Sequence, residues 1–184
     1  MRYHEMKIAG LDRKLPICKL NDKISIAGFI MFGDAELTVA TASELLKRVP
    51  EFDIIVTAEA KGIPLAHELS RQSGKKYLVC RKSAKLYMVN PVLVPVKTIS
   101  TAADQSLILD EPDLLELKGK RVLIADDVIS TGGALLALES LVEKAEGIVV
   151  AKATVLAEGD AADRKDIIYL EKLPLFETTA EEDR

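Results

Sequence analysis

Two adjacent carboxylates and a glycine-rich loop stand together in the second half of this chain. Residues 122–125 form an apolar run typical of a buried strand, and Asp126 and Asp127 follow it directly. A short loop of small residues comes next, and residues 135–142 have the length and leucine content of a buried helix. Backbone N–H groups in such a loop, beside a helix N-terminus, can bind a phosphate. Carboxylates accept hydrogen bonds from sugar hydroxyls, so the pattern predicts adjoining phosphate and sugar sites.

This segment closely resembles the ribose-phosphate binding motif of the type I phosphoribosyltransferases. The resemblance implies that Asp126 and Asp127 hold the ribose hydroxyls of phosphoribosyl pyrophosphate. It also implies that the loop holds the 5′-phosphate, through Ser130, Thr131, Gly132, Gly133 and Ala134. Many members have Thr or Ser at the position of Ala134, so this chain lacks one side-chain donor there. The alternative is a buried strand that merely ends in two aspartates, but the whole string is less common than a bare Asp-Asp pair.

Two further polar segments follow predicted strands, at residues 53–58 and 76–80. Ligands of parallel sheets bind at the carboxyl ends of the strands, where these segments and the acidic pair are expected to meet. Both resemble pyrophosphate-binding segments of adenine-type and xanthine-type enzymes, which implies contacts from Glu59, Ala60, Lys61, Gly62, Arg81, Lys82 and Lys85. Adenine-type enzymes commonly have Arg at the position of Lys61, and Lys keeps the charge without the bidentate fork.

The base site is expected near the N-terminus. Residues 29–34 resemble the adenine-type segment in which an aromatic ring stacks on the base and main-chain groups contact its edge. Phe32 is the stacking candidate, with Gly33 beside it and Val128 packing from the other face. An aromatic residue in an apolar run can equally belong to the core, and both interpretations of Phe32 stay open.

Alternating segments of strand and helix character must position these residues. Strands are predicted at residues 53–58, 76–80, 122–125, 148–156 and 167–170, and helices at residues 63–73 and 135–142. The alternation predicts an α/β fold, a mostly parallel twisted sheet with helices on both faces, as in the type I phosphoribosyltransferase fold. An extended β-arm at residues 92–96 is expected to pair with residues 106–109 across a flexible loop at residues 98–104.

Length and composition predict one domain with a small appendage. The 184 residues suit a single phosphoribosyltransferase domain, residues 1–184, with 48% hydrophobic residues. Residues 1–34 are interpreted as a hood that recognises the base, residues 35–176 as the core and residues 177–184 as a frayed tail. The net charge of −4 argues against a nucleic-acid partner. No run reaches the roughly 18 apolar residues of a membrane span, and the two distant cysteines suit a reducing cytoplasm.

These features together predict a purine phosphoribosyltransferase of salvage metabolism, adenine-like, that transfers a phosphoribosyl group from phosphoribosyl pyrophosphate to a purine base. The resemblance implies Mg²⁺ held mainly by substrate rather than by protein side chains, and a homodimer in which Arg81 reaches the neighbouring site. Adenine-type enzymes usually carry a Glu in the flexible loop, where this chain has Thr101, Ala102, Ala103 and then Asp104. Other 6-substituted purines therefore stay open. The alternatives are a regulator that senses phosphoribosyl pyrophosphate and a pyrimidine enzyme of orotate or uracil type.

Overall fold

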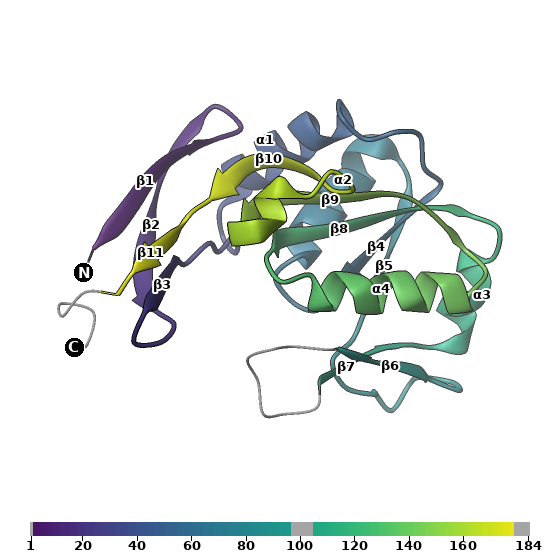
Figure 1. Cartoon of the computed structure of the whole chain (residues 1–184). Coiled ribbons are helices and arrows are strands. Elements are labelled where there is room, and N and C mark those ends of the chain that lie inside the picture. Colours follow the sequence, from purple (N-terminus) through teal and green to yellow (C-terminus); the bar gives the residue numbers. More distant parts are fainter. Residues whose placement is uncertain (1, 97–104, 179–184) are drawn as a thin grey trace.

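A five-stranded parallel sheet forms the centre of the molecule (Figure 1). The structure is a computed structural model, and it describes residues 2–96 and 105–178. The strands are rich in apolar and β-branched residues, as strands buried on both faces must be. In sheet order they are β10 (Ile168–Leu173), β9 (Ile148–Glu158), β8 (Arg121–Ile129), β4 (Ile54–Ala58) and β5 (Lys76–Cys80). Every neighbouring pair is parallel, so all the carboxyl ends lie along one edge of the sheet.

Helices cover both faces of this sheet, as the sequence predicts. Helices α1 (Ala35–Leu46) and α2 (Ile63–Ser73) pack on one face, where Leu37 and Leu65 meet Leu123 in a cluster called here the hood-side cluster. Helices α3 (Glu111–Leu117) and α4 (Gly133–Lys144) pack on the other face, in a second cluster that contains Val122 and Ile124 of β8. Strand side chains alternate between the two faces, which is why one strand supplies both clusters. Among the described residues, no helix is both long and apolar enough to cross a membrane.

A second, antiparallel sheet lies beyond the carboxyl ends of the parallel strands (Figure 1). It contains β1 (Tyr3–Ile8), β2 (Leu11–Lys19), β3 (Ile24–Ala27) and β11 (Leu175–Glu177), in that order. The hood therefore takes one strand from the far end of the sequence. The interpretation of residues 177–184 as frayed is wrong at its start, because Glu177 pairs with Ile24 and the Thr178 N–H donates to the Lys23 carbonyl at 3.2 Å. Residues 179–184 lie outside the described residues.

The predicted β-arm is present. Strands β6 (Val92–Val96) and β7 (Gln105–Leu109) pair antiparallel, with Val92 opposite Leu109, and Val94 and Leu107 enter the same cluster as α4. The flexible loop expected at residues 98–104, with the position of the missing Glu, falls outside the described residues.

Strand β8 runs further than the sequence predicts, and this places the acidic pair. The apolar run ends at residue 125, but β9 continues to pair with β8 as far as Ile129 opposite Ala157. Pairing with β4 stops earlier, at Val56 opposite Ile124. Asp126 and Asp127 therefore lie in the part of β8 that pairs with β9 but no longer with β4, and the loop that follows β4 packs beside them.

Candidate active site

The two aspartates occupy different environments at the end of β8. Asp127 is buried, and its backbone N–H donates to Asp126 Oδ1 at 2.9 Å. Burial raises the pKa of the Asp126 carboxyl above its ordinary value, and the negative charge of Asp127 raises it further. One hydrogen bond inside the pair leaves the remaining carboxylate oxygens as acceptors. Such a pair can receive the protons of two neighbouring hydroxyl groups.

The loop after β4 brings a cation to this pair. Lys61 Nζ lies 3.0 Å from Asp127 Oδ2, and the lysine side chain is half exposed. Gly62 is the residue immediately before α2, and a Cβ added there would lie 2.3 Å from Thr57 Oγ1 and 2.8 Å from Asp126 Oδ1. Only glycine permits that approach. The Glu59–Ala60 peptide bond in this loop is cis.

Glu59 does not offer its side chain to a phosphate. Its carboxylate accepts the Lys82 backbone N–H at 3.0 Å and lies 3.3 Å from Arg81 Nε. The Lys82 N–H, and then the charge of Arg81, lower the pKa of Glu59. Two anions repel, so the Glu59 carboxylate is better placed to orient Arg81 than to contact pyrophosphate. Lys85 Nζ donates to Ser83 Oγ at 2.7 Å in the same exposed segment.

The predicted phosphate loop ends at the start of α4. Gly132 is the residue before the helix and has a left-handed φ of 81°, which favours glycine. Gly133 and Ala134 form the first turn, while Ser130 and Thr131 are exposed. The first backbone N–H groups of the helix therefore point out of its end with no partner inside the helix, an arrangement that suits an anion.

The predicted base residues lie on the hood side of the sheet. Phe32 is 54% exposed, whereas its neighbours Phe29 and Met31 are buried in the hood-side cluster. Gly33 follows Phe32 with a left-handed φ of 81°. Val128 packs against the same cluster from β8. Phe32 is thus an exposed aromatic rather than a core residue, and its ring is available for stacking.

Sequence reasoning missed three residues at this edge. Thr57 is buried, and its Oγ1 has no hydrogen-bond partner within residues 2–96 and 105–178. Glu158 ends β9, and Arg164 lies close to Gly132. Glu158 lies on the face of the sheet that carries the hood-side cluster, because its β10 partner Leu173 belongs to that cluster and parallel partners share a face. A motif search could not have found these residues, since their positions depend on strand register and on contacts distant in sequence.

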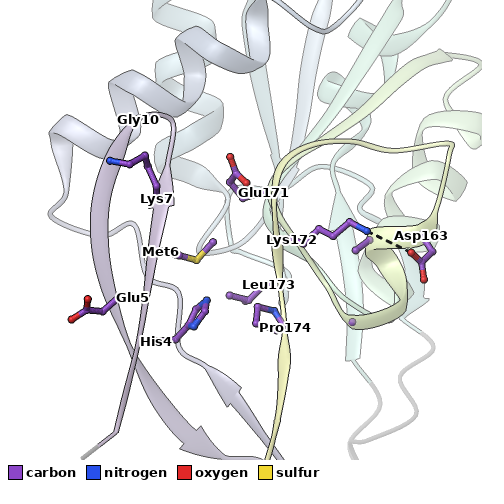
Figure 2. Close-up of a pocket in the computed structure, with 12 residues that line it drawn as sticks. His4, Glu5, Met6, Lys7, Gly10, Asp163, Glu171, Lys172, Leu173 and Pro174 are labelled. Carbon is purple, nitrogen blue, oxygen red and sulfur yellow. Dashed lines mark ion pairs between the residues drawn. The ribbon is translucent and has the colours of Figure 1, made fainter.

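A separate cavity of about 730 Å³ lies between β1 and β10 (Figure 2). Met6 and His4 point into it from β1, and Leu173 and Pro174 line it at the end of β10 and just after it. Lys172 Nζ lies 3.7 Å from Asp163 Oδ1. None of the residues of the predicted site lines it.

No cluster of three or more His, Cys, Asp or Glu side chains suited to a metal ion occurs in the part of the chain that the structure describes. The acidic pair alone supplies two carboxylates, which is fewer ligands than a protein cage for a hard divalent cation needs. Such an ion would fit here only if a bound substrate supplied further oxygens.

Comparison with known proteins identifies the family. The family model "Phosphoribosyl transferase domain" matches residues 39–177, which include the acidic pair, the phosphate loop and both cationic segments. The chain belongs to the phosphoribosyltransferase family. An adenine phosphoribosyltransferase of Cenarchaeum symbiosum is 37% identical over 62% of this chain and 66% of its own length. A hypoxanthine/guanine phosphoribosyltransferase of Methanococcus voltae is 34% identical over 76% of this chain and 71% of its own length.

Solved phosphoribosyltransferases have the same fold. The adenine phosphoribosyltransferase of Thermoanaerobacter pseudethanolicus is 28% identical with a TM-score of 0.64, over 76% of this chain and 82% of that one. The Trypanosoma brucei enzyme, solved with AMP, pyrophosphate and ribose-5-phosphate, is 17% identical with a TM-score of 0.68, over 94% of this chain and 75% of that one. The predicted parallel sheet with helices on both faces is confirmed, and both curated relatives are named as purine phosphoribosyltransferases.

Proposed function

We propose that this phosphoribosyltransferase joins a free purine to the phosphoribosyl group of phosphoribosyl pyrophosphate and releases pyrophosphate. The observation that carries the proposal is the meeting of Asp126, Asp127 and Lys61 beside the glycine loop of α4. The names of the curated relatives support a purine as the acceptor. The finer points, a cytoplasmic location, a homodimer and the role of each site residue, belong to the same proposal.

In this proposal the acidic pair accepts hydrogen bonds from the ribose hydroxyls, and the loop at residues 130–134 holds the 5′-phosphate. Lys61 has two alternative partners. In the free protein it neutralises Asp127 at 3.0 Å, and an arriving pyrophosphate group competes for the same ammonium. When Lys61 pairs with the pyrophosphate instead of with Asp127, the Asp127 carboxylate becomes free to accept hydrogen bonds from the ribose. Arg81, oriented by Glu59, adds a second cation on that side.

Bond cleavage at the anomeric carbon builds positive charge on the ribose, as in glycosyl transfer generally. The acidic pair lies where that charge develops, so the two carboxylates stabilise it while they position the sugar. Asp126 and Asp127 are the side chains that would help to hold Mg²⁺ once substrate supplies further oxygens, and the ion would supply positive charge to neutralise the leaving group. Phe32 and Val128 hold the purine from two sides in this arrangement.

The test is pyrophosphate release. Purified protein is mixed with phosphoribosyl pyrophosphate, Mg²⁺ and one free base at a time: adenine, hypoxanthine, guanine, xanthine, orotate or uracil. Release that requires a purine supports the proposal, and release only with orotate or uracil would establish the pyrimidine alternative. Binding of phosphoribosyl pyrophosphate without turnover on any base would favour the regulator. That alternative finds little support in residues 2–34, which form strands and contain no DNA-reading helix.

A further inference from the structure

The phosphate loop contains no cation of its own. Its five residues are Ser130, Thr131, Gly132, Gly133 and Ala134. Backbone N–H groups and the helix dipole attract an anion, but a phosphate monoester carries close to two negative charges near neutral pH. A nearby guanidinium strengthens such binding through short, charge-assisted hydrogen bonds. A side chain from elsewhere in the fold can supply this charge.

Arg164 is that side chain. It follows η1 (Gly159–Asp163), the short 3₁₀ helix after β9, and its backbone N–H donates to the Ala161 carbonyl at 3.2 Å. A Cβ placed on Gly132 would lie only 2.7 Å from Arg164 Nη1 and 4.0 Å from its Cζ. The guanidinium therefore lies directly against the last loop residue before α4. Glycine is needed at position 132 for two reasons. Its left-handed φ of 81° favours glycine, and a Cβ there would collide with Arg164.

A chain of ion pairs fixes the orientation of this guanidinium. Arg164 Nε and Nη2 donate to the two oxygens of Asp166 at 2.9 and 2.6 Å. Lys152 Nζ donates to the same carboxylate at 2.7 Å and to Glu139 of α4 at 2.7 Å. The network thus joins β9, the segment after η1 and α4, and the side chain of Lys152 is largely buried. A bidentate pair leaves little freedom to the planar fork.

The third guanidinium nitrogen is left for the loop. Within residues 2–96 and 105–178, Arg164 Nη1 makes no hydrogen bond to another residue. The nitrogen that lies against Gly132 is therefore the one with unused donors. The network contains two positive side chains, Arg164 and Lys152, and two negative ones, Asp166 and Glu139, so its net charge is zero. The charge that lies against the loop is nevertheless the positive one of Arg164.

We infer that Arg164 is a positioning residue of the 5′-phosphate site, which holds the Gly132 loop in its anion-accepting form and supplies the positive charge that the loop lacks. Asp166 and Lys152 act through Arg164 by orienting it. The inference rests on the proposed function, because it concerns the same substrate. It adds to the motif a residue from a segment about 30 positions later in the chain, which the motif itself does not include.

The experiment compares two fragments of the substrate. Ribose 5-phosphate carries the 5′-phosphate, whereas pyrophosphate represents the leaving group, and calorimetry measures the Kd of each. Arg164→Met keeps much of the side-chain volume and removes the charge. This substitution should raise the Kd for ribose 5-phosphate about tenfold, the loss expected when a hydrogen bond to a charged group is removed. The Kd for pyrophosphate should stay unchanged. Arg164→Lys should retain part of the affinity, and Asp166→Asn should lose part of it.

The matched control is Arg71→Met. Arg71 makes a similar bidentate pair with Glu68 on α2, at 2.9 and 2.7 Å, away from the loop. The Arg71→Met substitution should leave the Kd for ribose 5-phosphate and the Kd for pyrophosphate unchanged. Equal affinity of Arg164→Met and wild type for ribose 5-phosphate would overturn the inference, and so would equal weakening of both ligands, which indicates general damage to the fold. If Arg164→Met does not fold, Arg164→Lys and Asp166→Asn give the same comparison. A wild-type protein that binds neither ligand would instead contradict the proposed function.

Discussion

At the scale of single residues, the proposed function needs Asp126 in a position where its ionised form destabilises the fold. Burial and then the charge of Asp127 raise its pKa in the folded protein. A carboxyl group whose folded pKa lies above its unfolded value, about 4, stabilises the fold fully only below that unfolded value. The contribution is lost as pH rises through the folded pKa. Near neutral pH, ionising this carboxyl therefore weakens the fold that positions it.

Asp126→Asn removes this ionisation. It should raise the free energy of unfolding near pH 8 by roughly 1 kcal/mol or more, and change it little near pH 4. Turnover should fall by about 100-fold, because an amide presents donors where hydroxyl protons must be accepted. Urea unfolding at the two pH values measures the first effect. Asp12→Asn, at an exposed hood position, is the control. A stability gain of the same size at both pH values would contradict the argument.

Phe32 is the candidate for base stacking, and it is exposed while its neighbours are buried. Loss of a stacking face costs about 1–3 kcal/mol of base affinity. Phe32→Ala should therefore raise the KM for the purine about tenfold or more and leave the KM for phosphoribosyl pyrophosphate nearly unchanged. Steady-state kinetics with each substrate varied in turn makes the measurement. Unchanged purine kinetics would remove Phe32 from the base site.

Glu158 gives a basis for choosing among purines. Burial raises the pKa of its carboxyl group, against the opposing charge of Lys61, and the residue lies at the end of β9 on the face that carries the hood-side cluster. The Glu158 side chain makes no hydrogen bond or ion pair to a residue in the described ranges, 2–96 and 105–178. A carboxylate there should favour a base that presents two adjacent donors, as guanine does with its N1–H and 2-amino groups, over xanthine, which has a carbonyl acceptor in place of the amino group. Glu158→Leu should lower kcat/KM for guanine by about tenfold relative to xanthine. A constant ratio of kcat/KM between guanine and xanthine would place Glu158 outside base recognition.

At the scale of elements, the site depends on how closely α2 approaches β8. A Cβ on Gly62 would meet Thr57 Oγ1 at 2.3 Å and Asp126 Oδ1 at 2.8 Å. Gly62→Ala must therefore push the helix start away from the acidic pair. It should cost about 1–3 kcal/mol of stability and lower turnover more than the stability loss explains, since Lys61 moves with the loop.

Gly28→Ala is the matched control, because an added Cβ there meets Pro16 at an ordinary 3.5 Å. Thermal unfolding and turnover of the two variants are compared. A Gly62→Ala protein with normal turnover would show that the approach of α2 to Asp126 has no role in catalysis.

At the scale of the whole molecule, the segment after β5 suggests where a second copy binds. Leu86, Tyr87 and Val89 are exposed large hydrophobic residues, and Tyr87 lines a small cavity together with Arg81. Exposed apolar side chains gathered in one segment are typical of an interface. If this surface joins the proposed homodimer, Leu86→Asp should shift the protein to a monomer and lower turnover at dilute concentration. Light scattering measures the mass. Leu20→Asp, at an exposed position between β2 and β3, should leave it unchanged. A dimer that survives Leu86→Asp would exclude this surface.

The sequence by itself determined the parallel α/β core and the ends of several elements. Helix α2 begins at Ile63 and stops at Gly74, which has the left-handed φ of 70° that glycine favours. The spacing of apolar residues and the positions of glycines are local features of the sequence, so the elements they indicate can be predicted without tertiary information. The acidic pair and its loop were also visible, because a binding motif on one strand, loop and helix is contiguous in the chain.

Only the tertiary structure decided what surrounds that motif. The chain of apolar residues in β8 stops before Asp126, yet pairing with β9 carries the strand on to Ile129, and hydrogen bonds to a neighbour leave no mark in the strand's own sequence. In the same way, Glu177 joins the hood through β3, Lys61 neutralises Asp127, and Arg164 lies against Gly132. Each of these contacts joins residues far apart in the chain, and what creates it is the packing of whole elements rather than the preference of any one segment.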